Sequence, residues 1–234
     1  MTTPHLHRAQ LLIEQHRYAD AERELGMALG QDPDDAWAHA MLALCLVNRK
    51  AYAEGGQRAQ QSIRLAPDSA EIRYLAARVE LARNAYDDAE RLFSEALALD
   101  PHNADAFAGR AATHAARKHW HDALKDCERA LESDPENTEA INLRALANRG
   151  LGRPAEGLAD MEQALRVDPN DAYSHANLGW AHLEKGDLSS AEQHFREALR
   201  IDPTLEWARV GVLETTKARF PLYRWVLHYF LWMA

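Results

Sequence analysis

The chain has 234 residues, of which 47% are hydrophobic and 27% are charged, so it has enough apolar material for a core and is not a disordered protein. Its formal net charge of −9 argues against a general nucleic-acid binder, because such proteins gain affinity by neutralising phosphates. Two cysteines, Cys45 and Cys127, are too few for a disulfide framework. No signal-peptide pattern and no apolar run of roughly 18–20 residues is present, so we expect a soluble, cytoplasmic protein.

The prolines predict a repeated architecture. Six of the nine recur at intervals of 34 residues, and five of these six follow an aspartate. A fixed period of this length is typical of stacked repeats rather than of one closed domain. The recurring prolines are Pro33, Pro67, Pro101, Pro135, Pro169 and Pro203. With each of these at position 32, the chain divides into six units: 2–35, 36–69, 70–103, 104–137, 138–171 and 172–205.

Three positions in each unit hold a small residue in all six copies. Position 8 is alanine or glycine, position 20 is alanine or glycine, and position 27 is alanine or serine. Small side chains at a fixed spacing let two helix backbones approach closely. These positions therefore predict the points at which helices cross.

Each unit also carries the signals that begin and end helices. The proline disfavours a helical conformation in the residue before it and so ends the preceding helix. Asn84, Gly152 and Gly186 mark a short break near positions 15–16. Position 34 holds a residue that can cap a helix N-terminus in five units, namely Asp35, Ser69, Asn103, Asn137 and Asp171. The pattern predicts an all-α chain in which each unit is a pair of antiparallel helices of about 14 residues.

With this pattern the sequence resembles the tetratricopeptide repeat family. The last unit, 172–203, comes closest, with Leu178, Gly179, Ala191, Phe195 and Ala198 in the signature places before the recurring proline. The resemblance implies a right-handed superhelical solenoid of antiparallel helix pairs. It also implies that the first helices of successive units line a concave face on which the family holds peptides.

Position 7 is apolar in the family but is arginine in three units of this chain. In the same three units position 23 is acidic, and in the other three it is not. An inward-facing arginine needs a carboxylate to offset its desolvation, so we predict an ion pair between the two helices of each of these units. The predicted structural ion pairs are Arg8–Glu24, Arg110–Asp126 and Arg144–Asp160.

The sequence predicts no catalytic residue, no metal site and no cofactor. The histidine pairs His5/His7 and His119/His121 lack the i, i+4 spacing and the Cys or carboxylate set that suit zinc. Histidine also recurs at position 4 of three units, where the family packs aromatic residues, and we interpret these side chains as structural. The two cysteines occupy core positions and are interpreted as small buried hydrophobes. We therefore expect no enzyme activity.

The concave face is the predicted binding surface. Large apolar groups there are interspersed with arginine and asparagine, a composition suited to anchoring side chains and bonding peptide groups. The predicted groove residues are Trp37, Leu44, Val47, Tyr74, Arg78, Leu81, Asn142, Leu146, Arg149, Tyr173, Asn177 and Trp180. Unit 4 contributes only small residues, which predicts an open slot at Ala108, Gly109, Ala112, Ala115 and Ala116. The carboxylate clamp of the chaperone-binding family members is absent, because the positions that hold it in those members are mostly apolar here.

Residues 205–218 are predicted to form a helix that covers the end of unit 6, as terminal elements of solenoids do. The apolar segment 220–234 that follows is rich in aromatic residues and suits three interpretations: docking within the chain or on a second protomer, lying at a membrane surface, or beginning a transmembrane region. It resembles bacterial family members whose repeats continue into a membrane segment. The side chains assigned to this contact are Tyr223, Trp225, Tyr229, Phe230 and Trp232.

Together these patterns predict a non-catalytic scaffold whose partner is a protein or peptide in the concave groove. The alternative is a membrane-associated or self-oligomerising scaffold driven by 220–234, which would place the repeats at the cytoplasmic face of a membrane. Recognition of RNA by a helical-repeat protein is a third interpretation, and the acidic balance and the proline and small-residue positions weaken it.

Overall fold

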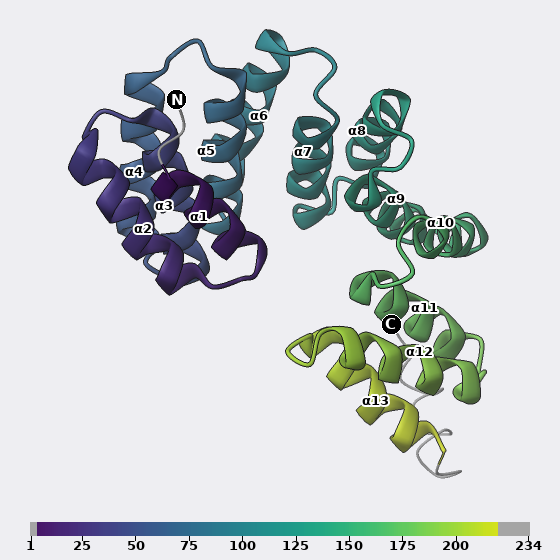
Figure 1. Ribbon diagram of the computed structural model, residues 1–234. Coiled ribbons are helices and arrows are strands. Elements are labelled where there is room, and N and C mark those ends of the chain that lie inside the picture. The colour runs from purple at the N-terminus through teal and green to yellow at the C-terminus, as the bar shows by residue number, and fades with distance from the viewer. Residues whose placement is uncertain (1–3, 220–234) are drawn as a thin grey trace. The chain divides into compact units, whose positions relative to one another are not determined.

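The computed structural model describes residues 4–219, apart from the side chains of residues 154–155. Within this range the chain forms thirteen α-helices and no β-strand (Figure 1), which confirms the predicted all-α fold. The first twelve helices form six pairs, one for each predicted unit, called repeats 1–6 below. In chain order the helices are α1 (Pro4–Glu14), α2 (Tyr18–Gln31), α3 (Ala36–Asn48), α4 (Tyr52–Leu65), α5 (Ala70–Ala82), α6 (Tyr86–Leu99), α7 (Ala104–Ala116), α8 (Trp120–Ser133), α9 (Thr138–Gly150), α10 (Pro154–Val167), α11 (Ala172–Glu184), α12 (Leu188–Ile201) and α13 (Glu206–Ala218).

The described helices gather into two compact units, α1–α8 up to Ser133 and α9–α13 from Asp134 on. Within each unit the two helices of a repeat pack against each other, and the second helix of one repeat packs against the first helix of the next. In the second unit α13 packs against both helices of repeat 6, as predicted for the capping helix. Each unit is therefore a stack of helix hairpins.

The predicted capping residues begin the first helices of repeats 2–6. In each case a side-chain oxygen accepts a hydrogen bond from a backbone N–H of the first turn, which satisfies a donor that has no partner within the helix. The bonds are Asp35 to Ala38 (2.9 Å), Ser69 to Ile72 (3.2 Å), Asn103 to Ala106 (2.8 Å), Asn137 to Ala140 (2.9 Å) and Asp171 to Ser174 (3.2 Å).

A residue in the left-handed conformation forms the turn between the two helices of every repeat. The φ angles at position 15 are 57° at His16, 67° at Lys50, 59° at Asn84, 61° at Lys118, 75° at Gly152 and 78° at Gly186. This conformation turns the next N–H back to the helix that has just ended. In repeat 4, for example, the N–H of His119 donates to the carbonyl of His114 at 2.9 Å. The break that the sequence predicts is thus a tight turn that places the two helix ends side by side.

The small residues at positions 8, 20 and 27 are buried in all six repeats, as expected for the places where helices cross. The slot predicted in repeat 4, however, is filled at Gly109, whereas Ala112 is half-buried and Ala116 is exposed. A Cβ atom added to Gly109 would lie 2.4 Å from the ring of Phe93, which is itself fully buried. Ala108 and Ala115 are buried as well. At Gly109, a phenylalanine of the preceding repeat therefore occupies space that the sequence assigns to a ligand side chain.

Within the described residues no helix combines the length and the apolar character that crossing a membrane requires. The C-terminal segment 220–234, with the predicted contact residues Tyr223, Trp225, Tyr229, Phe230 and Trp232, lies outside the described residues.

Candidate functional site

In the first unit, helices α3 and α5 bring together several of the predicted groove residues. Trp37 and Leu44 on α3 and Tyr74 on α5 are half-buried and pack around a buried cluster of Ala40, Ile72 and Leu75. Leu81, one turn beyond Arg78 on α5, is also half-buried. The aromatic and aliphatic side chains are thus held in place by the core while part of each stays exposed.

Val47 does not belong to this surface. Its side chain is only 3% exposed and packs where a Cβ of Gly55 would lie, 2.6 Å from Val47 Cγ1. Position 20 of this repeat is Gly55, which has no side chain. Helix α4 can therefore approach α3 closely, and it covers Val47. The prediction that Val47 faces a ligand is therefore wrong.

Trp37, Leu44, Tyr74, Arg78 and Leu81 together are called the α3–α5 surface below. Arg78 is its exposed cation. Its guanidinium carbon lies 5.8 Å from the centre of the Tyr74 ring, and Nη1 lies 3.4 Å from the Tyr74 hydroxyl oxygen. Among the described residues no carboxylate forms an ion pair with Arg78. An aromatic face and an uncompensated guanidinium therefore stand next to each other, an arrangement that can receive an acidic group beside an apolar one.

In the second unit Asn142 is already engaged. Its amide nitrogen donates to Asp171 Oδ2 at 2.6 Å, and its amide oxygen accepts from the Ser174 hydroxyl at 2.6 Å. These bonds join α9 to the N-terminus of α11, so Asn142 stabilises the stacking of repeats 5 and 6. The sequence predicted an amide available to a peptide backbone, and the structure uses it internally instead.

Asn177 and Trp180 are covered by the capping helix. Trp207 of α13 donates its indole N–H to Asn177 Oδ1 at 3.3 Å, and its ring stacks on Trp180 with centroids 4.7 Å apart. The indole N–H of Trp180 in turn donates to the carbonyl oxygen of Trp207 at 3.3 Å. Both predicted groove residues are thus part of the contact between repeat 6 and α13. On the same helix Tyr173 keeps 59% of its surface exposed.

Arg149 and Leu146 on α9 are half-buried, and no described carboxylate forms an ion pair with Arg149. The second unit thus has an arginine and a leucine on one helix, as the α3–α5 surface has an arginine beside apolar side chains.

Two of the three predicted ion pairs are present. Arg110 binds Asp126 through two hydrogen bonds, Nε to Oδ2 at 2.8 Å and Nη2 to Oδ1 at 2.7 Å, and this bond raises the pKa of Arg110. Arg144 Nη2 lies 2.7 Å from Asp160 Oδ1. Asp126 and Asp160 are 4% and 8% exposed, so each carboxylate is buried, while the side chains of Arg110 and Arg144 each keep 23% of their surface exposed.

The third predicted pair, Arg8–Glu24, is not formed. Glu24 lies 2.6 Å from His5 Nδ1 instead, and Arg8 is exposed. The difference has a structural cause, because Arg110 also donates to Ser94 of the preceding repeat at 3.1 Å. In the described part of the chain no helix precedes α1, so nothing covers Arg8 or holds it inward.

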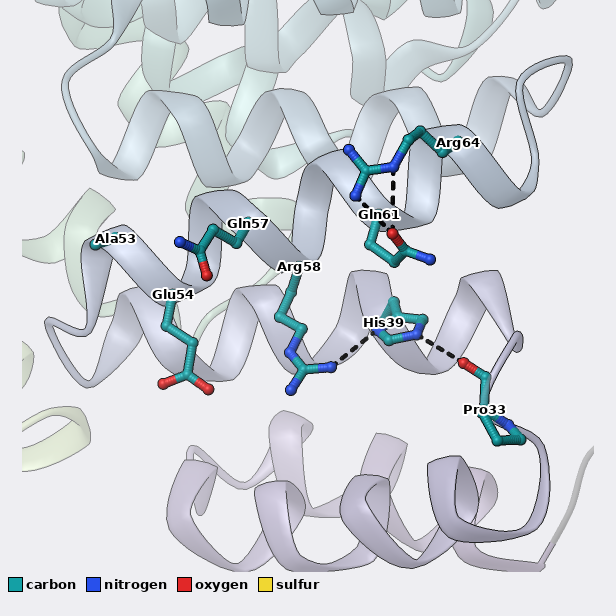
Figure 2. A pocket seen from close by; sticks show the side chains of 8 residues that line it. All are labelled: Pro33, His39, Ala53, Glu54, Gln57, Arg58, Gln61 and Arg64. Atoms are coloured by element: carbon teal, nitrogen blue, oxygen red, sulfur yellow. Dashed lines mark hydrogen bonds between the residues drawn. The ribbon is translucent and has the colours of Figure 1, made fainter.

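Histidines at position 4 contact position 23 of their own repeat, which the sequence analysis missed. His39 Nδ1 lies 3.4 Å from Arg58 Nη1, while His39 Nε2 lies 2.9 Å from the carbonyl oxygen of Pro33 (Figure 2). Burial lowers the pKa of His194 in repeat 6, and neighbouring histidines lower it further. The recurrence of histidine at one position was the available signal, and it marks structural contacts.

An open hollow of about 740 Å³ lies beside this His39 contact, and Figure 2 shows its residues. Most of them, including Gln57, Gln61 and Arg64, belong to α4, and Arg64 donates to Gln61 at 2.6 Å. The hollow therefore lies on the second helix of repeat 2, away from the side chains that α3 and α5 present together.

One group of three side chains in the described residues has the donors and the spacing to hold a metal ion: His114, His119 and Asp122. The sequence predicts no metal site, since His119 and His121 lack a zinc-ligand spacing, and only the structure brings His114 near His119 across the helix–turn–helix junction.

Two family models described as tetratricopeptide repeat match this chain, one over residues 12–79 and 80–147 and the other over residues 142–206. No curated protein matches.

Solved structures of other proteins are similar in fold. A tetratricopeptide repeat protein from Parabacteroides merdae has a TM-score of 0.76 at 16% identity, over 91% of this chain and 83% of that chain. The APC/C hetero-tetramer Cut9–Hcn1 gives a TM-score of 0.73 at 16% identity, over 90% of this chain but only 42% of that chain. YrrB, described as a TPR protein with an unusual peptide-binding site, gives a TM-score of 0.51 at 22% identity, over 79% of this chain and 95% of that chain.

Proposed function

Because this chain belongs to the tetratricopeptide repeat family, we propose that it is a scaffold that binds peptide segments of other proteins. A stack of helix hairpins offers an extended surface to a partner, which suits an elongated ligand better than a small molecule. The peptide-binding site described for YrrB supports a binding role for this fold.

We place the peptide-binding site of the first unit on the α3–α5 surface, formed by Trp37, Leu44, Tyr74, Arg78 and Leu81. Arg78 carries this assignment, because it is exposed, lies against an aromatic ring and has no carboxylate partner among the described residues. The half-buried side chains around it are fixed by the core, so a ligand would not have to order them on binding.

The ligand that fits this surface is a peptide with an acidic residue next to a large apolar one. The carboxylate would pair with the guanidinium of Arg78, and the apolar side chain would cover Trp37 and Leu44. In the second unit Leu146, Arg149 and Tyr173 would act in a similar way. Asn142, Asn177 and Trp180 are not included, since their polar groups or rings are engaged within the chain.

The test uses the full chain to select binders from a random peptide library and then measures their affinity by fluorescence anisotropy. We expect the selected peptides to combine Asp or Glu with an aromatic or aliphatic residue. Arg78→Ala should weaken their binding about tenfold, which corresponds to about 1.4 kcal/mol. Arg64→Ala is the matched control, because Arg64 is an exposed arginine on α4 outside this surface.

Equal affinity of the selected peptides for Arg78→Ala and for the wild type would show that the α3–α5 surface is not their site. A comparable loss in Arg64→Ala would show that the effect is one of net charge and not of a specific contact. Both variants change exposed side chains, so circular dichroism should record an unchanged helix content.

A further inference from the structure

His114, His119 and Asp122 meet where repeat 4 turns from its first to its second helix. His114 lies in the last turn of α7, His119 immediately precedes α8, and Asp122 lies in the first turn of α8. Each offers a ligand atom, a ring nitrogen or a carboxylate oxygen, and the three atoms lie within 4.8 Å of one another. The left-handed residue Lys118 makes the turn that brings them together.

A buried carboxylate lies behind the ring of His114. It is only 9% exposed, and its Nε2 lies 3.5 Å from Asp126 Oδ2. Asp126 is held in turn by two hydrogen bonds from Arg110. A ring that donates from Nε2 offers its lone pair at Nδ1. A carboxylate behind a histidine fixes the ring and increases its basicity in many metal sites.

The second nitrogen of this ring has no hydrogen-bond partner. Nδ1 of His114 is buried and unpaired among the described residues. A buried polar atom without a partner costs free energy, and a metal ion held also by His119 and Asp122 would supply an interaction for it. The side chains of His119 and Asp122 are exposed, so a solvent ion can reach them.

We propose that His114, His119 and Asp122 bind a divalent transition-metal ion, and that zinc is the metal their donors fit best. Two imidazole nitrogens and one carboxylate oxygen are ligands that Zn²⁺ accepts, and three protein ligands leave its fourth position open to solvent. Bound there, the ion would link the end of α7 to the start of α8 and stabilise repeat 4.

Repeat 5 provides an internal comparison. Asn148 holds the place of His114 and donates to Asp160 at 3.0 Å, so the contact behind the first ligand is common to both repeats. The places of His119 and Asp122 are taken by Arg153 and Glu156, and a guanidinium has no lone pair to offer a metal. Repeat 5 therefore lacks the set of three donors that repeat 4 has.

The test is a zinc titration of the metal-stripped full chain by calorimetry, with cobalt as a visible-absorption probe of the same ligands. All proteins carry His194→Gln, which removes competition from the histidine cluster of repeat 6. We expect one zinc ion per chain, bound at least tenfold more weakly by His119→Ala and by Asp122→Asn. His121→Ala is the control, because His121 is exposed beside the site but does not belong to the three proposed ligands. The zinc affinity of this variant should stay within twofold of the parent protein's.

A second measurement separates binding at this site from binding elsewhere. Zinc should slow hydrogen exchange in residues 104–133 of the parent protein and should not do so in His119→Ala. No binding at millimolar zinc would overturn the proposal. Equal affinities of His119→Ala and His121→Ala, or protection confined to other segments, would overturn it as well.

Discussion

Removing the carboxylate of Asp126 should destabilise repeat 4 far more than removing that of Asp122 on the same helix. Asp126 is 4% exposed and accepts hydrogen bonds of 2.8 and 2.7 Å from Arg110. Without Asp126, the guanidinium of Arg110 is 23% exposed, and its remaining hydrogen bond is to the neutral hydroxyl of Ser94. Breaking a buried pair by removing one partner typically costs 3–5 kcal/mol, and the partial exposure of Arg110 places our expectation near the lower end, at about 3 kcal/mol.

The assay is urea unfolding followed by circular dichroism, with a chelator present so that bound metal cannot contribute. Asp122→Ala should change the free energy of unfolding by no more than about 0.5 kcal/mol, as is usual for exposed positions. The double variant Arg110→Met/Asp126→Leu should recover most of the loss, because it removes both charges and leaves no unpaired group. Hydrogen exchange should locate the loss in residues 104–133, since repeats respond locally. Equal losses in Asp126→Ala and Asp122→Ala would refute the reasoning.

Three further predictions follow from backbone geometry and burial. Gly109→Ala should lower the free energy of unfolding measured in urea by about 1–3 kcal/mol, because its Cβ would lie 2.4 Å from Phe93. Gly30→Ala, with nothing within 4 Å of its Cβ, should raise it by about 0.5–1 kcal/mol. Lys50→Gly should also stabilise, by about 0.5–1 kcal/mol, because φ is 67° there, and an unchanged midpoint would contradict this. Burial lowers the pKa of His194 below 6.5, and the neighbouring histidines lower it further. The stability that neutral His194 contributes is therefore complete above pH 6.5 and is lost as the pH falls toward the lowered pKa. His194→Gln should reduce that slope in thermal unfolding measured from pH 7 to 5.

The sequence predicts the helix pairs well because their signals are local. A proline and a capping residue act within one turn of the chain, so Asp35 and its equivalents mark helix starts without any knowledge of the fold. The Arg110–Asp126 pair was also predictable, because two positions vary together across repeats that share one geometry. The same rule failed for Arg8, because within the described residues no helix precedes α1 in the way that α6 precedes α7 beside Arg110.

The errors in the predicted groove come from contacts between elements that the repeat pattern treats separately. The sequence indicated a capping helix, yet only the structure shows that its Trp207 covers Trp180 and Asn177. The slot at Gly109 is filled by a phenylalanine from the preceding repeat. A position within a repeat indicates the face of a helix, but what lies on that face depends on the neighbouring repeats.

The distribution of charge bears on the ligand that this chain can hold. Many of its arginines form surface pairs with an acid three or four residues away, as Arg91 does with Asp88 and Glu95, and such pairs add little stability. Arg78 and Arg149 have no such partner among the described residues. At a physiological screening length of about 8 Å, an acidic residue in contact with Arg78 is attracted by it while the net charge of −9 is largely screened. A run of acids would extend beyond that contact and meet the part of the repulsion by the net charge that salt leaves unscreened, so we expect a peptide with one carboxylate to bind more tightly than one with several. Lowering the salt concentration should weaken the polyacidic peptide relative to the other, and the opposite order in anisotropy titrations would contradict this account.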